Sequence, residues 1–381
     1  MSFQQTTDVL IIGAGVIGCA CAYYLSKHGI KVTVLERSEI GSQASGAAAG
    51  LFSWLKPSAK LDPYNRLLLA SHALFPSLVS ELQDATGIAI EYVQSGTLRT
   101  IQHSKRIARL QSWLAFCQRE ELPVTLLSEE QTRSLEPLLS PDICASLSFP
   151  TEGQVRAPSV VAALSQAAIN NGSLFYPRTE VVAAHHHAHR VLSVTTTTGE
   201  KISCGHLIIA TGAWSASCGA WFDLDIPVHP QRGQILSLLQ PSPPIRHVII
   251  GKGIYIAPKQ DGTVIIGATN DDVGFDTSNT ASGILALLDA AITLVPLLAQ
   301  CTFVRAWAGL RPKTPDNYPI IGPVPDWHNL TLATGHYSFG VLLSAITAQA
   351  ITELLTMGKT PETIQPFSLE RFAPRSPSHT E

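Results

Sequence analysis

The sequence predicts an α/β protein with two lobes, one built on a parallel sheet and the other an α+β lobe rich in strands. An apolar run at residues 9–12 leads into Gly13, Gly15 and Gly18, and a second apolar run ends at Glu36. This succession of strand, tight turn, helix and strand is typical of a parallel sheet. The length of 381 residues exceeds one simple core, so we expect a second lobe.

The three glycines have the spacing G-x-G-x-x-G of a dinucleotide-binding turn. Gly13 permits the tight turn, Gly15 lets the backbone approach a pyrophosphate, and Gly18 lets the helix lie close to the sheet. The helix N-terminus directs N–H groups and a partial positive charge at the phosphates, and Gly29 is expected to cap its other end. Glu36 is an acid of the kind that binds a ribose 2′-hydroxyl. We therefore expect dinucleotide binding.

The composition argues against several classes of protein. Hydrophobic residues make up 45% of the chain and charged residues 14%, with a net charge of −3, which gives no electrostatic reason to expect a nucleic acid partner. Residues 9–26, 281–304 and 330–352 are long and apolar, but glycines, Pro296 or a Gly-His-Tyr turn interrupt them. We interpret them as buried core rather than membrane spans, and leave peripheral membrane association open.

Cysteine usage points to a reducing compartment. The seven cysteines are odd in number and form no C-x-x-C pair, so we interpret them as free buried thiols. The expected location is the cytoplasm.

The elements after Glu36 follow from periodicity and turn residues. Residues 41–50 are almost all Gly, Ser and Ala, and we interpret them as a loop that approaches a large flat cofactor closely, rather than as a flexible linker. Helices are expected at residues 63–85, 104–121, 128–136, 158–170, 281–298 (interrupted near Pro296) and 340–355. Strands are expected as a pair within 88–103, a meander in 180–212, a β-rich region in 226–270 and a strand at 330–334.

One biased tract, His185 to His189, falls at an expected hairpin tip. A metal site there would need partner ligands, and none lies nearby in the sequence. We expect a solvated turn and no metal.

The segments with a cofactor-facing character come from both ends of the chain: residues 13–50, 210–214 and 319–341. A cofactor threaded through the molecule needs such distant contacts, whereas a nicotinamide docked at one sheet edge does not. This distribution favours a flavin.

Taken over nearly its whole length, the sequence resembles the D-amino-acid oxidase superfamily, in its glycine oxidase and sarcosine oxidase branch. Besides the glycine turn with Glu36, the matching motifs are residues 47–50, 210–215, 232–234, 255–258, 307–312, 319–322 and 335–337. The resemblance implies a two-lobe flavoprotein with a discontinuous Rossmann-like FAD-binding domain (1–85, 145–220 and 307–381) and a β-rich substrate domain (86–144 and 221–306).

The resemblance also implies the roles of individual residues. Arg311 and Tyr255 stand where the family clamps a substrate carboxylate, and an arginine fork suits that task because it can bind both oxygens. The helix that begins at Gly340 would direct its N-terminal amides at the flavin. The cofactor-binding residues implied are Gly13, Gly15, Val16, Ile17, Gly18, Glu36, Arg37, Ala44, Ser45, Ala49, Gly50, Leu51, Val181, Thr211, Gly212, Trp214, Gly335, Tyr337, Ser338, Phe339, Gly340, Val341 and Leu342.

Two departures from the family pattern bear on the substrate and the cofactor. Glycine oxidases have Gly-His-aromatic-Arg-Asn-Gly at the last motif, whereas Ser338 and Phe339 stand here in place of the Arg-Asn pair. A second cation is therefore missing, which weakens glycine as the substrate and favours a larger or N-substituted amino acid. No Cys or His stands where sarcosine oxidase relatives attach flavin covalently, so we expect non-covalent FAD.

The expected reaction is oxidation of an amine carbon next to a carboxylate. The α-hydrogen would leave as hydride, the imine would hydrolyse, and oxygen or a quinone would reoxidise the flavin. A flavin-dependent 2-hydroxy acid dehydrogenase is the first alternative, with His336 as its candidate base. A flavin-binding module for RNA modification or a protein partner is the second. A homo-oligomer is compatible with either.

Overall fold

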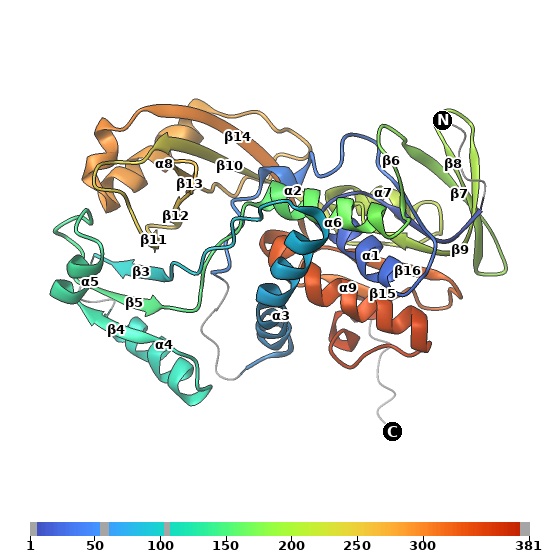
Figure 1. The fold of residues 1–381 in the computed structure, drawn as a ribbon, viewed down its shortest axis with the longest axis horizontal. Helices are drawn as coiled ribbons and strands as arrows, with labels where there is room; N and C mark the ends of the chain where they lie inside the picture. The colour runs from blue at the N-terminus through green and yellow to red at the C-terminus, as the bar shows by residue number, and fades with distance from the viewer. Residues whose placement is uncertain (1–5, 54–60, 103–106, 374–381) are drawn as a thin grey trace, which may run out of the picture.

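The computed structural model describes residues 6–53, 61–102 and 107–373. In this part of the chain the strands form two eight-stranded sheets, which lie in the two halves of the molecule (Figure 1). The predicted α/β fold is confirmed, with one largely parallel sheet and one largely antiparallel sheet.

The first sheet has the order β15-β16-β9-β1-β2-β6, and β7 and β8 extend it beside β9. Its central pairs, β16–β9, β9–β1, β1–β2 and β2–β6, are parallel. The bounds are β1 Thr6–Ile12, β2 Val32–Leu35, β6 Leu174–Tyr176, β7 Val181–His187, β8 Arg190–Thr196, β9 Lys201–Ile209, β15 Ile320–Pro323 and β16 Leu330–Thr334.

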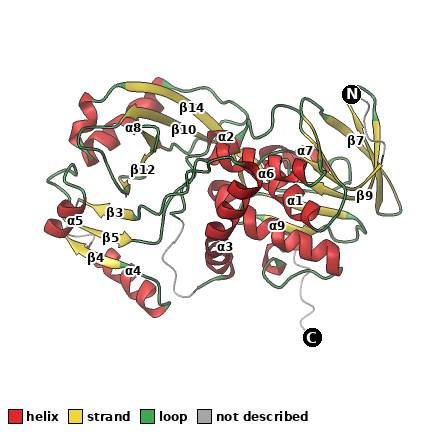
Figure 2. Ribbon diagram, viewed as in Figure 1, coloured by secondary structure: helices red, strands yellow, loops and turns green. Residues whose placement is uncertain are grey.

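Helices bury one face of this sheet. Residues of α1 (Val16–Lys27), α3 (Pro63–Thr86), α6 (Ala157–Asn170) and α9 (Gly340–Met357) belong to one apolar cluster. Figure 2 shows these four helices lying together in one half of the molecule. Asp62 caps α3 by accepting a hydrogen bond from Asn65 N at 2.7 Å, and Gly29, with φ +74°, follows the end of α1 as expected.

The second sheet has the order β14-β10-β13-β12-β11-β3-β5-β4. Its bounds are β3 Thr97–Ile101, β4 Thr125–Ser128, β5 Ala145–Phe149, β10 His229–Leu239, β11 Val248–Gly251, β12 Ile254–Pro258, β13 Thr263–Gly267 and β14 Phe303–Lys313. Helix α8 (Ala281–Leu294) packs on it through Leu287, Ala291 and Leu294. Two further helices belong to this half, α4 (Ile107–Arg119) and α5 (Glu129–Leu135).

Most predicted elements are present with shifted ends. Helix α8 stops at Leu294, before Pro296 opens a 3-10 turn, and Ser128 and Gln131 form a capping box at the start of α5. The first residues of the helix expected at 104–121 lie outside the described residues. The strand pair expected at 88–103 is wrong: β3 forms there, but Glu91 has φ +54° and Val93 makes only an isolated bridge to Gln154. A left-handed residue interrupts the extended run that a strand needs.

The His-rich tract lies where a hairpin was expected. His185 to His187 end β7, and Ala188 and His189 form the left-handed turn into β8. Within the described residues no group of three or more His, Cys, Asp and Glu side chains is arranged to hold a metal.

The apolar segment before the C-terminus is a core helix by its packing. Among the described residues, Tyr337–Met357 is the one helix long and apolar enough to cross a membrane. Of its most apolar window, 67% is buried inside the protein, against α1 and α3.

The division into two domains stays a proposal, and sheet membership bears on two of its boundaries. Strand β5 and the whole of β14 pair within the second sheet. The boundaries at residues 145 and 307 therefore fall on strands that belong with the second sheet.

Gly18 supplies a test of how closely α1 packs on the sheet. A Cβ at this position would overlap the Gly13 carbonyl oxygen. Helix propensity alone would favour alanine here by about 1 kcal/mol, whereas this overlap must push α1 away. We expect Gly18→Ala to lower the free energy of unfolding by about 1–3 kcal/mol in urea denaturation. A more stable variant would contradict the packing argument.

Candidate active site

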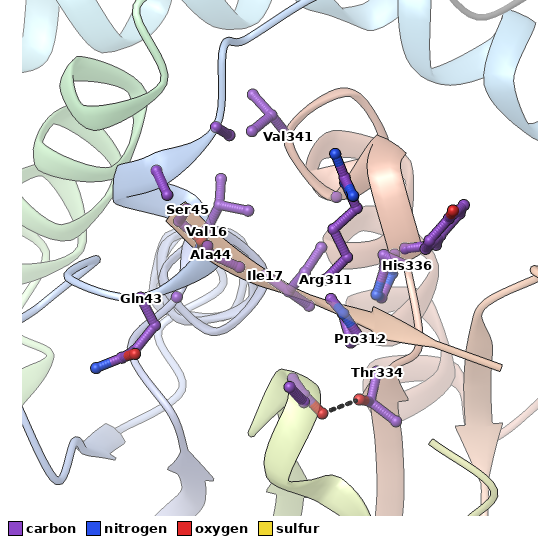
Figure 3. A pocket seen from close by; sticks show the side chains of 18 of the residues that line it. Val16, Ile17, Gln43, Ala44, Ser45, Arg311, Pro312, Thr334, His336 and Val341 are labelled. Carbon is purple, nitrogen blue, oxygen red and sulfur yellow. Dashed lines mark hydrogen bonds between the residues drawn. The ribbon is translucent and has the colours of Figure 1, made fainter. Parts of the chain in front are cut away.

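One cavity of about 650 Å³ joins the two halves of the molecule. Its walls come from the turn after β1, the end of β2, residues 43–53, the segment after β9, strands β12 and β14, and the start of α9. Figure 3 shows side chains from these distant parts of the chain around the same space. The volume falls in the range of ligand-binding cavities.

The structure brings most of the predicted cofactor residues to this cavity. Those that line it are Gly13, Gly15, Val16, Ile17, Glu36, Arg37, Ala44, Ser45, Ala49, Gly50, Leu51, Val181, Thr211, Gly212, Trp214, Tyr337, Ser338, Phe339, Gly340 and Val341.

Three predicted cofactor residues are not in the wall. Gly18 faces the Gly13 carbonyl, and Gly335 (φ +71°) packs against Thr314. Leu342 is fully buried, and its carbonyl accepts a hydrogen bond from Ser71 Oγ.

Glu36 organises the nucleotide end of the cavity. Its Oε2 accepts a hydrogen bond from Ala14 N at 2.8 Å, and its Oε1 accepts one from Ser38 N at 2.9 Å. Each carboxylate oxygen keeps a further lone pair that a ribose hydroxyl can use. Ser45 Oγ accepts from Val16 N at 2.9 Å, so the small-residue loop also caps the start of α1.

The small-residue loop also contacts the half of the molecule that holds the second sheet. It contains the short helix α2 (Ala44–Ala47), and a Cβ on Gly309 of β14 would lie 2.6 Å from Ala47 Cβ. Trp307 Nε1 donates to Ala47 O at 3.0 Å, and Lys259 Nζ donates to Ala49 O at 2.7 Å. These contacts support the interpretation of a close-approach loop and not that of a flexible linker.

The residues present fit FAD, as a test on backbone geometry shows. Gly13 has φ +102° and Gly50 has φ +73°, and a Cβ on Gly13 would lie 2.5 Å from the Ala210 carbonyl oxygen. A side chain at Gly13 would thus collide with the segment after β9, so the tight turn requires glycine. Gly13, Gly15 and Gly50 line the cavity as bare backbone, which suits the close approach of a pyrophosphate. At the other end, Gly340 and Val341 bring the first turn of the 18-residue helix α9 to the wall.

Arg311 brings a charge without an acidic partner into the cavity. Its Nη1 donates to Thr269 O at 3.0 Å and to Asn270 Oδ1 at 3.1 Å, both neutral acceptors. Among the described residues, no carboxylate lies within ion-pair distance of this guanidinium. The missing side chain of Gly233 makes room for it, since a Cβ there would lie 2.6 Å from Arg311 Cζ.

Tyr255 stands beside this arginine. A Cβ on Gly267 would lie 2.7 Å from Tyr255 Cζ, so a glycine again makes the room. Burial raises the pKa of Tyr255 to about 12, and the nearby Arg311 acts in the opposite direction. The hydroxyl therefore stays protonated at physiological pH.

His336 reaches the wall but is engaged inside the protein. Its side chain is buried, and Nε2 shares a hydrogen bond of 3.0 Å with Thr347 Oγ1 of α9. Burial lowers the pKa of His336 to about 3, so the ring is neutral. Figure 3 shows Arg311 coming from a strand and His336 from the segment before α9.

Sequence reasoning missed part of the wall. Ile250, Ile254, Asn270 and Thr334 line the cavity without having been singled out. Thr334 Oγ1 and Ser215 Oγ lie 2.6 Å apart, which ties the end of β16 to the segment after β9. The position of Thr334 next to Gly335, in a motif already noticed, is the signal that could have found it.

Comparison with known proteins shows which family this chain resembles in sequence and structure. The family model described as "DAO: FAD dependent oxidoreductase" matches residues 8–354. The glycine oxidase of Geobacillus kaustophilus is 35% identical over 96% of this chain and 97% of its own length. The crystal structure of glycine oxidase from that organism superposes with a TM-score of 0.92 at 34% identity, covering 97% of this chain and 99% of the other. The hydrogen cyanide synthase subunit HcnC of Pseudomonas aeruginosa is 31% identical over 97% of each chain.

These matches confirm the predicted FAD dependence and the predicted class, an amino acid oxidoreductase. The resemblance noted from the motifs is also confirmed, since it extends over nearly the whole chain. The chain belongs to the DAO family of FAD dependent oxidoreductases.

Proposed function

We propose that this protein oxidises the C–N bond of a small or N-substituted amino acid that carries one α-carboxylate. The observation behind this proposal is the unpaired guanidinium of Arg311, in a cavity whose far end has the geometry of a dinucleotide site. A partly enclosed cation without an acid partner is a site for a ligand carboxylate.

Arg311 and Tyr255 would hold the substrate carboxylate. Thr269 O and Asn270 Oδ1 fix the Nη1 side of the guanidinium, which leaves its other N–H groups for the ligand. The protonated Tyr255 hydroxyl supplies one more donor. Holding the acid group at two points orients the α-carbon, and orientation accounts for much of the rate in a reaction without a covalent protein intermediate.

Bound FAD supplies the two-electron acceptor: the α-hydrogen leaves with its electron pair, and water hydrolyses the resulting imine to the oxo acid and the free amine. The amine must be neutral, because an ammonium has no lone pair to assist loss of the hydride. Gly340 and Val341, at the N-terminus of α9, would stabilise negative charge that develops in this part of the cavity.

The walls around Arg311 support a substrate with one acid group and some apolar volume. Ile250, Ile254 and Phe339 line the cavity with apolar side chains. Within the described part of its wall, Arg311 and Arg37 are the arginines, and Arg37 follows Glu36 at the nucleotide end. Because Ser338 stands where glycine oxidases have an arginine, Arg311 is the one arginine proposed for the substrate end of this wall. The relatives named glycine oxidase support a small amino acid as the class.

A 2-hydroxy acid substrate would need a base for its hydroxyl proton. His336 is the candidate base predicted from the sequence, but its Nε2 hydrogen-bonds with Thr347 Oγ1 and burial lowers its pKa to about 3. A group with so low a pKa is a poor proton acceptor at neutral pH. The surroundings of His336 therefore favour oxidation of an amino acid over oxidation of a 2-hydroxy acid.

Three further parts of the proposal concern the surroundings of the enzyme. Oxygen or a quinone would reoxidise the flavin. The seven free cysteines support a reducing compartment such as the cytoplasm. A homo-oligomer is retained as a proposal.

Replacing Arg311 tests the substrate site. We expect Arg311→Met to raise KM for amino acids by about 30-fold to several thousandfold, because a charged pair is lost, while the flavin spectrum stays intact. The measurement is anaerobic bleaching of the flavin by glycine, sarcosine, D- and L-amino acids, imino diacids and hydroxy acids. Arg305→Met on the same strand is the control, since Arg305 is exposed and lies over Trp307. Unchanged KM in Arg311→Met would sink the proposal.

The pH profile tests the requirement for a neutral amine. His336 is neutral above about pH 3, and Tyr255 is protonated up to about pH 12, since their pKa values lie there. We expect kcat/KM to rise with pH along one limb whose midpoint follows the amine pKa of the substrate used. Two substrates with different amine pKa values provide the comparison. A midpoint that is the same for both would instead assign the limb to a protein base.

Acid precipitation tests non-covalent binding. Cys218 lines the cavity, but burial raises the pKa of its thiol, which hydrogen-bonds to Thr211 Oγ1. A protonated thiol is a poor nucleophile. We expect trichloroacetic acid to release all the FAD to the supernatant, measured by absorbance. A yellow pellet would show attachment.

A further inference from the structure

The segment that follows β13 contacts both ends of the cavity. Residues 269–276, here called the strap, begin at the substrate end, where Thr269 and Asn270 accept hydrogen bonds from Arg311. Near its other end, Phe275 stacks on Trp214, with ring centroids 5.3 Å apart and ring planes inclined by 24°. Trp214 follows β9 of the first sheet and lines the cavity. The strap thus connects the second sheet to the wall that the first sheet provides.

Two buried side chains of β10 hold the strap in place. Arg232, with 5% of its side chain exposed, donates from Nε to Asp271 Oδ2 at 3.1 Å and from Nη1 to Asp276 Oδ2 at 2.5 Å. Gln234 Nε2 donates to Asp271 Oδ2 at 2.8 Å. Charged hydrogen bonds of this kind are strong when the donor is shielded from water. Phe275 therefore lies in a segment that is held at Asp271 and Asp276, and it directly precedes Asp276.

Phe275 gains little from burial, because 51% of it remains exposed. Its ring contact is with Trp214, and the guanidinium of Arg37 lies 3.7 Å from the centre of the same indole ring. Arg37 directly follows Glu36 at the nucleotide end of the cavity. The indole is thus supported from the first sheet by Arg37 and from the second sheet by Phe275.

We propose that Phe275 is a positioning residue for FAD: by stacking on Trp214 it keeps the indole in the cavity wall and slows loss of the cofactor. Without Phe275, Trp214 keeps its contact with Arg37 but loses its support from the strap. The indole then gains freedom to leave the wall, and the nucleotide end opens more often. An aromatic pair is worth enough for a change of about three- to tenfold in a rate constant.

The test measures the rate constant of FAD release from the holoenzyme without substrate. Dilution releases FAD, and its fluorescence rises as it leaves the protein. We expect Phe275→Ala to release FAD about three to ten times faster than the parent. Phe275→Trp, which keeps an aromatic ring, should restore slow release. Val273→Ala is the matched control, because Val273 lies in the same strap and is 42% exposed.

A double-mutant cycle distinguishes this role from general loosening of the strap. If Phe275 acts through Trp214, adding Phe275→Ala to Trp214→Ala should change the release rate little further. The kcat of Phe275→Ala at saturating FAD should stay near that of the parent. Phe275→Leu, which keeps apolar volume but no ring, replaces the alanine variant if that variant does not fold.

Two results would overturn the proposal: equal release rates for Phe275→Ala and Val273→Ala, or fully additive effects in the cycle. The proposal depends on the FAD site and not on the substrate assignment. Because release is measured without substrate, a failure here is distinguishable from unchanged KM in the Arg311 variant.

Discussion

The structure depends on the close approach of bare backbone around the cavity. Gly13 turns tightly against the Ala210 carbonyl, and Gly309 lets the helix of the small-residue loop lie on β14. Close packing transmits any added volume to its neighbours. Gly13 and Ala210 follow adjacent strands of the first sheet, so a side chain at Gly13 would displace the turn into α1, whereas one at Gly309 would push the small-residue loop away from the second sheet. Either change would alter the cavity, because Gly13, Ala47 and Gly309 all line it.

Two arginines on paired strands show how charge is distributed around that cavity. Arg232 of β10 is buried and paired with Asp271 and Asp276, and it fixes a loop. Arg311 of β14, opposite Gln231 in the same pair of strands, is bound by neutral acceptors only. The paired Arg232 serves the fold, whereas the unpaired Arg311 has the role proposed above, that of binding a ligand carboxylate.

The titratable groups at the substrate end fit a reaction in which the protein moves no proton. Burial holds His336 neutral and Tyr255 protonated through their shifted pKa values. Lys259, whose pKa burial lowers to about 8, donates to Ala49 O and Gln154 Oε1 behind the small-residue loop. His336 and Lys259 are engaged in hydrogen bonds within the protein and Tyr255 stays protonated, which agrees with the proposed hydride transfer assisted by the lone pair of the substrate amine.

The sequence by itself determined the parts that are local. The turn from Gly13 to Gly18, the acid at Glu36 and the glycine before His336 depend on spacing along the chain, and spacing is visible in a sequence. The same holds for Arg311, because its motif places it at a strand end near a proline. Tertiary structure alone decided that Asn270 contacts Arg311, that Phe275 stacks on Trp214 and that residues 88–93 form no regular strand. Those outcomes depend on which segments meet in space, and residues more than 40 positions apart leave no periodic pattern that predicts their contact.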